Sequence, residues 1–227
     1  VKLKDSAGNI DENTVASFGD EWLRMDQAQL SEAEKQAIFQ DYFAIFPFQD
    51  LPETASGYDM GCGSGRWATL VAPRVTSLCC IDASPEALAV AKGNLREFTN
   101  VEYLTASVSQ VDLPDGSFDF GYSLGVLHHV PDTQAAIASC AQLLKPGAPF
   151  LLYLYYALEH KPGWYKVIWK TSELFRAVVN KMPSPLKASS ANVLAASLYW
   201  PLAKLSHIFH LMGFDVENFP LSYYNDK

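Results

Sequence analysis

Three glycines at alternate positions, preceded by a carboxylate, form the part of the sequence best suited to bind a ligand. The segment reads Asp59-Met-Gly-Cys-Gly-Ser-Gly65 and follows directly on a short apolar run. Glycines at this spacing allow a tight turn and let backbone N–H groups approach a ligand closely. The Asp59 carboxylate suits a cationic amino group and would repel a phosphate placed on it. We therefore expect a binding loop in which Asp59, Gly61, Cys62, Gly63 and Gly65 contact the ligand.

Alternating apolar and helical patterns must position this loop. Strands are expected at residues 57–60, 75–81, 101–106, 118–124 and 150–155. Helices are expected at residues 31–46, 67–72, 85–95 and 131–144. Ser31 with Glu34 forms a capping-box pattern, and Ser84-Pro85 is a typical helix start. Strands that alternate with helices predict βαβ units, and hence a doubly wound, mostly parallel α/β sheet for residues 55–157.

Ligands of such sheets bind beyond the carboxyl ends of the strands, where the loop and Asp82 both fall. Further along the chain come the segments 113–119 (LPDGSFD), 125–132 (GVLHHVPD) and 143–147 (LLKPG). In this order, these features resemble the type 11 branch of the class I S-adenosylmethionine-dependent methyltransferases, which includes ubiquinone and menaquinone biosynthesis enzymes. The resemblance covers about residues 55–156. It implies a Rossmann-like fold and an enzyme that uses S-adenosylmethionine and releases S-adenosylhomocysteine.

The resemblance also implies roles for residues at the strand ends. The glycines of the loop would line the methionine and ribose portion of the cofactor. Asp82 would hydrogen-bond both ribose hydroxyls, and Ala83 would flank the adenine. The family usually has an acid at the end of the third strand, but Ser107 stands there, followed by Val108. Adenine recognition therefore needs a hydroxyl or backbone group in this chain.

Residues after the fourth strand and after the loop are the remaining candidates. The resemblance places Ser123 and Leu124 under the methionine moiety. Arg66 could pair with the cofactor carboxylate or with an acid on the N-terminal helix. His128 and His129 are equally good candidates for a general base, since imidazole titrates near neutrality, although a packed or backbone-bonded ring is the alternative. Methyl transfer requires a base only where the acceptor must lose a proton.

Two other functions remain open at this point. The segment 63–68 (GSGRWA) also fits Gly-x-Gly-x-x-Ala, the dinucleotide fingerprint, and Asp82 lies near the ribose position of that motif. An NAD-dependent oxidoreductase is therefore an alternative, against which Asp59 and the later segments argue. A module that binds the cofactor without catalysis is the second alternative.

The composition narrows the class of protein. The chain has 227 residues, 49% of them apolar, and a net charge of −8, which argues against nucleic acid as a partner. There is neither an apolar run of about 18 residues nor the order of a signal peptide. The four cysteines are not spaced as metal ligands, so no metal is expected. Reduced thiols in a cytoplasmic protein are the simpler interpretation.

Three parts are expected: an N-terminal arm and cap helix (1–54), the cofactor-binding core (55–157) and a helical segment (158–227). Residues 1–13 are interpreted as a polar arm, and Phe18 with Trp22 as either a cover for the cofactor or a staple onto the sheet. Between residues 158 and 206, seven basic residues stand against two acidic ones, interleaved with aromatic residues. The whole part 158–227 is interpreted as a lid for a small lipophilic or anionic acceptor, with ordinary packing as the alternative and membrane contact less favoured.

The end of the chain departs from the family pattern. The family fold finishes with a helix and a pair of strands, but only eleven residues follow Val216. We expect the final strand pair to be missing through truncation. The sheet edge left exposed could then pair two chains into a dimer.

Overall fold

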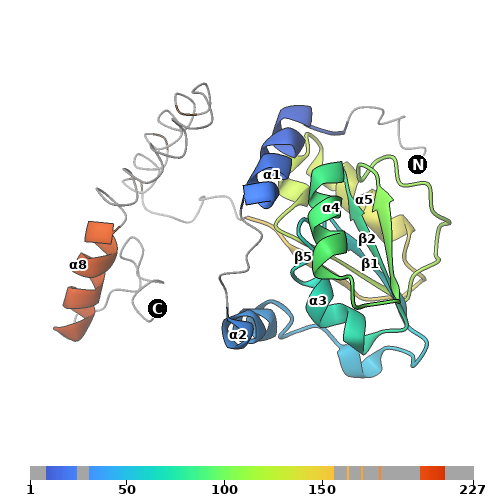
Figure 1. Ribbon diagram of the computed structural model, residues 1–227, viewed down its shortest axis with the longest axis horizontal. Coiled ribbons are helices and arrows are strands. Elements are labelled where there is room, and N and C mark those ends of the chain that lie inside the picture. Colours follow the sequence, from blue (N-terminus) through green and yellow to red (C-terminus); the bar gives the residue numbers. More distant parts are fainter. Residues whose placement is uncertain are drawn as a thin grey trace. The chain divides into compact units, whose positions relative to one another are not determined.

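The computed structural model describes residues 9–24, 31–155, the single positions 163, 170 and 179, and residues 200–212. The chain divides into two compact units, Val1–Tyr156 and Ala157–Lys227, which are described separately below (Figure 1). The candidate binding loop and the elements that position it belong to the first unit.

A five-stranded parallel sheet forms the centre of the first unit. Its strands are β1 (Ser56–Met60), β2 (Ser77–Asp82), β3 (Val101–Thr105), β4 (Phe120–Leu124) and β5 (Phe150–Tyr153). They lie in the order β3-β2-β1-β4-β5, so the strand order reverses between β1 and β4. The doubly wound parallel sheet expected from the sequence is confirmed.

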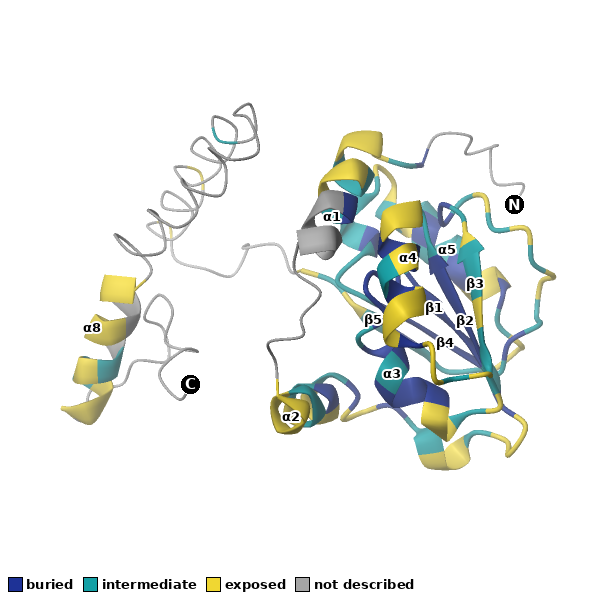
Figure 2. Cartoon of the chain, in the orientation of Figure 1, coloured by how far each residue is buried: buried dark blue, intermediate teal, exposed yellow. Residues whose placement is uncertain are grey.

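Helices cover both faces of this sheet. They are α1 (Glu12–Arg24), α2 (Glu32–Tyr42), α3 (Ala68–Val71), α4 (Pro85–Asn94) and α5 (Thr133–Gln142), with 3-10 turns η1 (Phe48–Asp50), η2 (Ala72–Arg74) and η3 (Leu127–His129). Phe39 of α2, Val71 of α3 and Leu88 of α4 belong to one apolar core, whereas Ala136 and Cys140 of α5 belong to the other. Figure 2 shows the buried residues concentrated on the central strands and on the inner faces of the helices.

Local sequence explains where these helices begin. The predicted capping box is present, because Ser31 and Glu34 each bond the other's backbone N–H. Ser84 accepts a hydrogen bond from the backbone of Ala87 at the start of α4, and Asp132 accepts one from Ala135 at the start of α5. Side chains that accept from free N–H groups in this way stabilise a helix start by about 1 kcal/mol.

The register of β1 against β4 is set by two glycines and two aromatic rings. Gly57 lies opposite Phe120, and Tyr58 lies opposite Gly121. A Cβ built on Gly57 would stand 2.1 Å from the Phe120 ring, and one on Gly121 would stand 2.3 Å from the Tyr58 ring. Each strand therefore leaves space where its neighbour places an aromatic side chain, which brings the carboxyl ends of β1 and β4 side by side.

Helix α1 is additional to the elements expected from the sequence. The interpretation of residues 1–13 as a polar arm is wrong at its end, because the helix begins at Glu12. Asp11 caps it, since its Oδ1 accepts from the backbone N–H groups of Asn13 and Thr14. Gly19 permits close packing on α4, because a Cβ there would lie 2.7 Å from Ser84 Oγ. Figure 1 shows α1 beside α4.

Within the second unit, the structure describes one helix at length, α8 (Trp200–Leu211). Most of the acceptor lid predicted at residues 158–227 lies outside the described residues. The expectation about the final strand pair also concerns residues that the structure does not describe. Across the described ranges, no helix combines the length and apolar character needed to cross a bilayer. In those same ranges, no three or more His, Cys, Asp or Glu residues are grouped as metal ligands.

Candidate functional site

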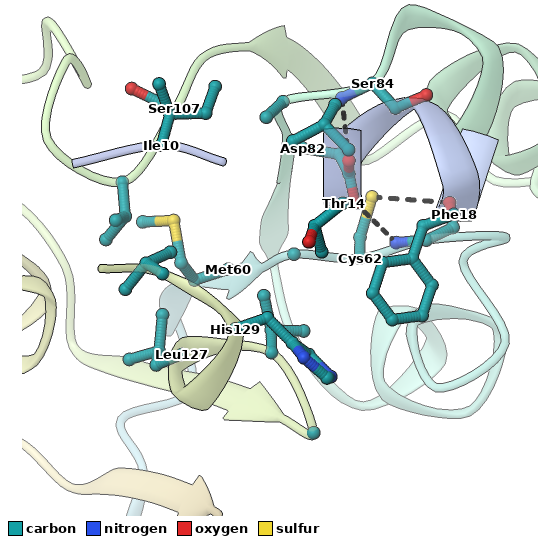
Figure 3. Close-up of a pocket in the computed structure, with 18 of the residues that line it drawn as sticks. Ile10, Thr14, Phe18, Met60, Cys62, Asp82, Ser84, Ser107, Leu127 and His129 are labelled. Carbon is teal, nitrogen blue, oxygen red and sulfur yellow. Dashed lines mark hydrogen bonds between the residues drawn. The ribbon is translucent and has the colours of Figure 1, made fainter. Parts of the chain in front are cut away.

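A cavity of about 170 Å³ lies at the carboxyl ends of β1, β2, β3 and β4 (Figure 3). Ten of the residues expected to bind the cofactor or act as a base line it: Gly61, Cys62, Gly63, Arg66, Asp82, Ala83, Ser107, Val108, Leu124 and His129. The other four lie outside its wall: Asp59, Gly65, Ser123 and His128. The structure thus brings together residues that are far apart in the sequence, at the edge where the strand order reverses.

The glycine loop is held against the end of β2 by backbone hydrogen bonds. The N–H groups of Gly61 and Cys62 both donate to the carbonyl of Ile81, at 2.7 and 3.1 Å. Gly61 has a φ of 77°, and a Cβ there would stand 2.4 Å from Val126 Cγ1. Only glycine therefore allows the loop to pass this close to Val126, which follows β4 in the chain.

Asp82 joins the loop to the start of α4. Its Oδ2 accepts from Gly63 N and its Oδ1 from Ser84 N, both at 2.9 Å (Figure 3). Burial raises the pKa of Asp82, and the same backbone donors oppose that rise. A carboxylate oxygen can accept more than one hydrogen bond, so both oxygens retain the capacity to accept from a ligand.

Asp59 lies behind the cavity wall rather than in it. Its side chain is 2% exposed, and its Oδ2 has no hydrogen-bond partner within the described part of the chain. Burial raises the pKa of Asp59 to about 8. The buried Tyr122 side chain interacts electrostatically with it. Direct contact between Asp59 and a ligand stays a prediction.

Gly65 and Ser123 have structural contacts that explain their place outside the wall. A Cβ on Gly65 would lie 2.8 Å from Leu95 Cδ1 and 3.2 Å from Ala91 Cβ, so this glycine lets α4 approach the loop. The Ser123 hydroxyl donates to the carbonyl of Met60 at 2.8 Å and links β4 to β1. Their expected contacts with the cofactor also stay predictions.

Two polar groups in the wall lack partners among the described residues: Ser64 Oγ and Arg66 Nε. Ser64 is 1% exposed. The Arg66 guanidinium lies 4.2 Å from the Trp67 ring centroid, and burial lowers the pKa of Arg66. In the described ranges Arg66 forms no ion pair, so a pairing with the N-terminal helix is not seen. Unpaired buried donors are costly, although both atoms have almost no accessible surface and so do not themselves face the cavity. Ser64 was not among the predicted site residues, and its only signal in the sequence is its position between Gly63 and Gly65.

The structure separates the two histidines that the sequence left equivalent. His129 lines the cavity, and the Phe18 ring packs edge-on against it with 5.0 Å between centroids. His128 packs instead on Tyr155, with 4.2 Å between centroids, and neither of its ring nitrogens has a hydrogen-bond partner in the described part of the chain. Burial lowers the pKa of both histidines, which favours neutral imidazoles near pH 7.

At the end of β3, a hydroxyl replaces the acid that the family pattern would place there. Ser107 is 7% exposed, and its Oγ donates to Gln110 Oε1 at 3.2 Å. Ser107 and Val108 both line the cavity, next to Ala106. The polar groups available at this end of the cavity are therefore the Ser107 hydroxyl and the local backbone.

The N-terminal segment supplies a wall that the sequence analysis did not define. Its members are Asn9, Ile10, Asp11, Thr14, Val15 and Phe18. Figure 3 shows Ile10, Thr14 and Phe18 around the same cavity as Met60, Leu127 and His129. The interpretation of Phe18 as part of a cover agrees with this position, whereas the side chain of Trp22 lies outside what the structure describes.

The residues that form this site are similar in sequence to a known protein family. Residues 58–152 match the type 11 family model described as a methyltransferase domain. A curated relative, the ubiquinone biosynthesis O-methyltransferase of Xanthomonas axonopodis pv. citri (strain 306), is 37% identical over 103 residues, which are 44% of this chain and 43% of the relative. The same-named protein of Xanthomonas campestris pv. campestris (strain B100) is 38% identical over 96 residues, 41% of this chain and 40% of that protein. The chain thus matches less than half the length of these relatives.

Solved structures show the same fold. A provisionally assigned methyltransferase from Bacillus halodurans C-125 aligns with a TM-score of 0.52 at 22% identity, covering 60% of this chain and 58% of that one. The N-methyltransferase NodS from Bradyrhizobium japonicum WM9, in complex with S-adenosyl-L-homocysteine, aligns with a TM-score of 0.50 at 20% identity, covering 61% and 72%. Residues 58–152 are accordingly similar to a methyltransferase domain, and the solved structures share the Rossmann-like fold of the first unit.

Proposed function

We propose that this chain, through its methyltransferase domain, transfers the methyl group of S-adenosylmethionine to a small acceptor by in-line displacement. The observation that carries the proposal is one cavity that joins the glycine loop of β1, Asp82 at the end of β2 and His129 after β4. When bound, the cofactor supplies a sulfonium methyl that is already activated for displacement. The protein must then align the acceptor with that methyl group and exclude water.

The residues present fit this cofactor. Asp82 would accept from the ribose hydroxyls with the capacity left after its two backbone bonds. Arg66, which lines the cavity and forms no ion pair among the described residues, would hold the methionine carboxylate. Asp59 would complement the methionine ammonium from behind Gly61, because a positive charge nearby favours the ionised form of a buried carboxyl.

The adenine would lie toward the end of β3. Ala83 and Val108 provide apolar contacts in the cavity wall there, and the Ser107 hydroxyl is the polar group of that wall. Leu124, at the end of β4, would contact the methionine portion. This arrangement keeps the order of roles that the sequence resemblance implies, with a hydroxyl in place of an acid at Ser107.

His129 would take a proton from the acceptor where the acceptor needs to lose one. Its lowered pKa keeps the imidazole neutral near pH 7, which is the form that accepts a proton. His128 lies outside the cavity wall and would support the position of its neighbour, since the two rings are 4.0 Å apart between centroids. Methyl acceptors that are already nucleophilic would need neither.

The acceptor side of the proposal rests on the sequence. Residues 1–54 would cover the core of residues 55–157, and residues 158–227 would recognise a small acceptor that is lipophilic or anionic. The names of the curated relatives favour oxygen over nitrogen or carbon as the accepting atom. The four cysteines are free, which suits a reducing compartment such as the cytoplasm.

The dimer expected from an exposed sheet edge is also part of the proposal. Light scattering at high concentration would test it, and a monomer would count against it.

Calorimetric titration tests the cofactor assignment directly. We expect the 227-residue chain to bind S-adenosylhomocysteine at micromolar concentration and to give no heat with NAD or NADH under the same conditions. Binding of NAD without a response to S-adenosylhomocysteine would overturn the proposal and favour an oxidoreductase. A screen of small acceptors with labelled S-adenosylmethionine then separates an active enzyme from a module that only binds the cofactor.

A further inference from the structure

The side chain of Asn9 joins the N-terminal segment to a residue 123 positions away in the sequence. Its Nδ2 donates to the backbone carbonyl of Asp132 at 2.8 Å, and its Oδ1 accepts from the backbone N–H of the same residue at 2.7 Å. Asn9 is 5% exposed. A buried amide that pairs with both backbone groups of one distant residue fixes the position of the segment that carries it.

Asp132 closely follows the segment after β4 that lines the cavity, although it does not line the cavity itself. It caps α5 through a hydrogen bond from Ala135 N to its Oδ1, at 2.9 Å. The preceding residues Leu127, His129 and Val130 all line the cavity. The Asn9 amide therefore connects one end of the N-terminal wall to the segment that carries the candidate base.

The other end of the N-terminal wall is held by packing. Phe18 lies edge-on against the His129 ring, and Gly19 lies against Ser84 at the start of α4. Between these two attachments, Ile10, Asp11 and Thr14 line the cavity. Residues 9–18 thus cross the cavity from the start of α5 to the start of α4, and the Asn9 end is attached through hydrogen bonds of one side chain.

We propose that Asn9 is a positioning residue that latches residues 9–18 over the cofactor cavity, so that cofactor entry and product release require these two hydrogen bonds to open. The proposal rests on the proposed function, because it assumes that S-adenosylmethionine occupies the cavity. The latch also sets the place of Phe18 against His129, since both contacts belong to the same short segment. Opening at Asn9 exposes the cavity without disturbing the sheet or the glycine loop.

The release rate of S-adenosylhomocysteine from the full chain tests the latch. Stopped-flow displacement should show at least tenfold faster release from Asn9→Ala than from the unchanged protein. Asn9→Asp should fall between the two, because its carboxylate still accepts from Asp132 N but cannot donate to the Asp132 carbonyl. Asn13→Ala is the matched control: Asn13 is exposed in the first turn of α1 and does not line the cavity, so its release rate should be unchanged.

A purely structural role for Asn9 would lower the melting temperature without a selective effect on release. Equal release rates for Asn9→Ala and Asn13→Ala, with S-adenosylhomocysteine bound by both, would overturn the latch and leave the proposed function intact. Failure of the unchanged protein to bind S-adenosylhomocysteine would instead overturn the proposed function. If Asn9→Ala does not fold, Asn9→Asp is the variant that tests the latch. Release of S-adenosylhomocysteine from Asn9→Asp that is no faster than from Asn13→Ala then counts against the latch.

Discussion

Replacing Asp82 with alanine should weaken the binding of S-adenosylhomocysteine by about 1.5–3 kcal/mol, which is the value of hydrogen bonds to a charged group. This loss corresponds to a roughly 10- to 150-fold increase in the dissociation constant. The carboxylate already accepts from Gly63 N and Ser84 N at 2.9 Å, so its position is fixed before any ligand arrives. Fixed acceptors bind a ligand hydroxyl without a further cost of ordering.

The same substitution also frees the Gly63 and Ser84 N–H groups, so part of the loss could come through the loop. A thermodynamic cycle in which both the protein and the ligand are changed separates the lost ligand contact from the effect on the loop. We expect the penalty of Asp82→Ala to be smaller for a 2′-deoxy analogue of S-adenosylhomocysteine, because one of the contacts removed by the substitution is absent from that ligand. Calorimetry measures all four affinities, and Asp112→Ala, at an exposed acid, serves as the control.

Two results would refute the ribose assignment. One is an unchanged affinity of Asp82→Ala for S-adenosylhomocysteine, with a melting temperature close to that of the unchanged protein. The other is a penalty of the same size for both ligands, which would show that the carboxylate acts only by holding Gly63 and the loop in place.

Three further predictions concern the loop and the residues near it. Gly61→Ala should destabilise the protein by about 1–3 kcal/mol, since its φ is 77° and the new Cβ would meet Val126 at 2.4 Å; an unchanged thermal midpoint would contradict this. With an acceptor that needs a base, His129→Gln should lower kcat by about 10²–10⁴-fold and His128→Gln by much less, and equal effects in steady-state assays would refute the distinction. Because burial raises the pKa of Asp59 to about 8, the folded protein keeps a proton that the unfolded chain releases near pH 4. The stability of the ligand-free protein should then fall as pH rises from about 4 to 8, by up to about 1.4 kcal/mol per unit, and urea unfolding of Asp59→Asn should lack this slope.

Much of the core could be predicted from local sequence. Apolar runs between turn signals gave all five strands, and cap residues gave the starts of α2, α4 and α5. The predicted ends of strands were less accurate where backbone groups form hydrogen bonds with residues far away in the sequence. The fourth strand was expected from residue 118, but Phe118 N donates to Leu143 O and Asp119 N to Ser56 O, so the named strand begins at Phe120. Partners that determine such ends are distant in the sequence and cannot be read from a local pattern.

Helix α1 and the wall it forms could not be predicted in this way. A glycine within a helical stretch usually weakens a helix assignment, yet Gly19 is needed because Ser84 Oγ would lie 2.7 Å from a Cβ. The attachment of Asn9 to Asp132 spans 123 residues and leaves no local signal. The two histidines show the same limit, because the choice between His128 and His129 depends on whether Tyr155 or Phe18 packs against each ring.

The glycine loop itself combines three different requirements that look identical in the sequence. Gly61 leaves space for Val126 just after β4, Gly63 donates its N–H to Asp82 of β2, and Gly65 leaves space for Leu95 at the end of α4. The first two line the cavity, whereas the third lies outside its wall. The three glycines are therefore required by close packing between neighbouring elements as much as by contact with a ligand. This explains why the loop alone fits both a dinucleotide and a methyl donor: close packing of strand, loop and helix is common to both. The Asp59 carboxylate and the later segments 113–119, 125–132 and 143–147 must make the distinction.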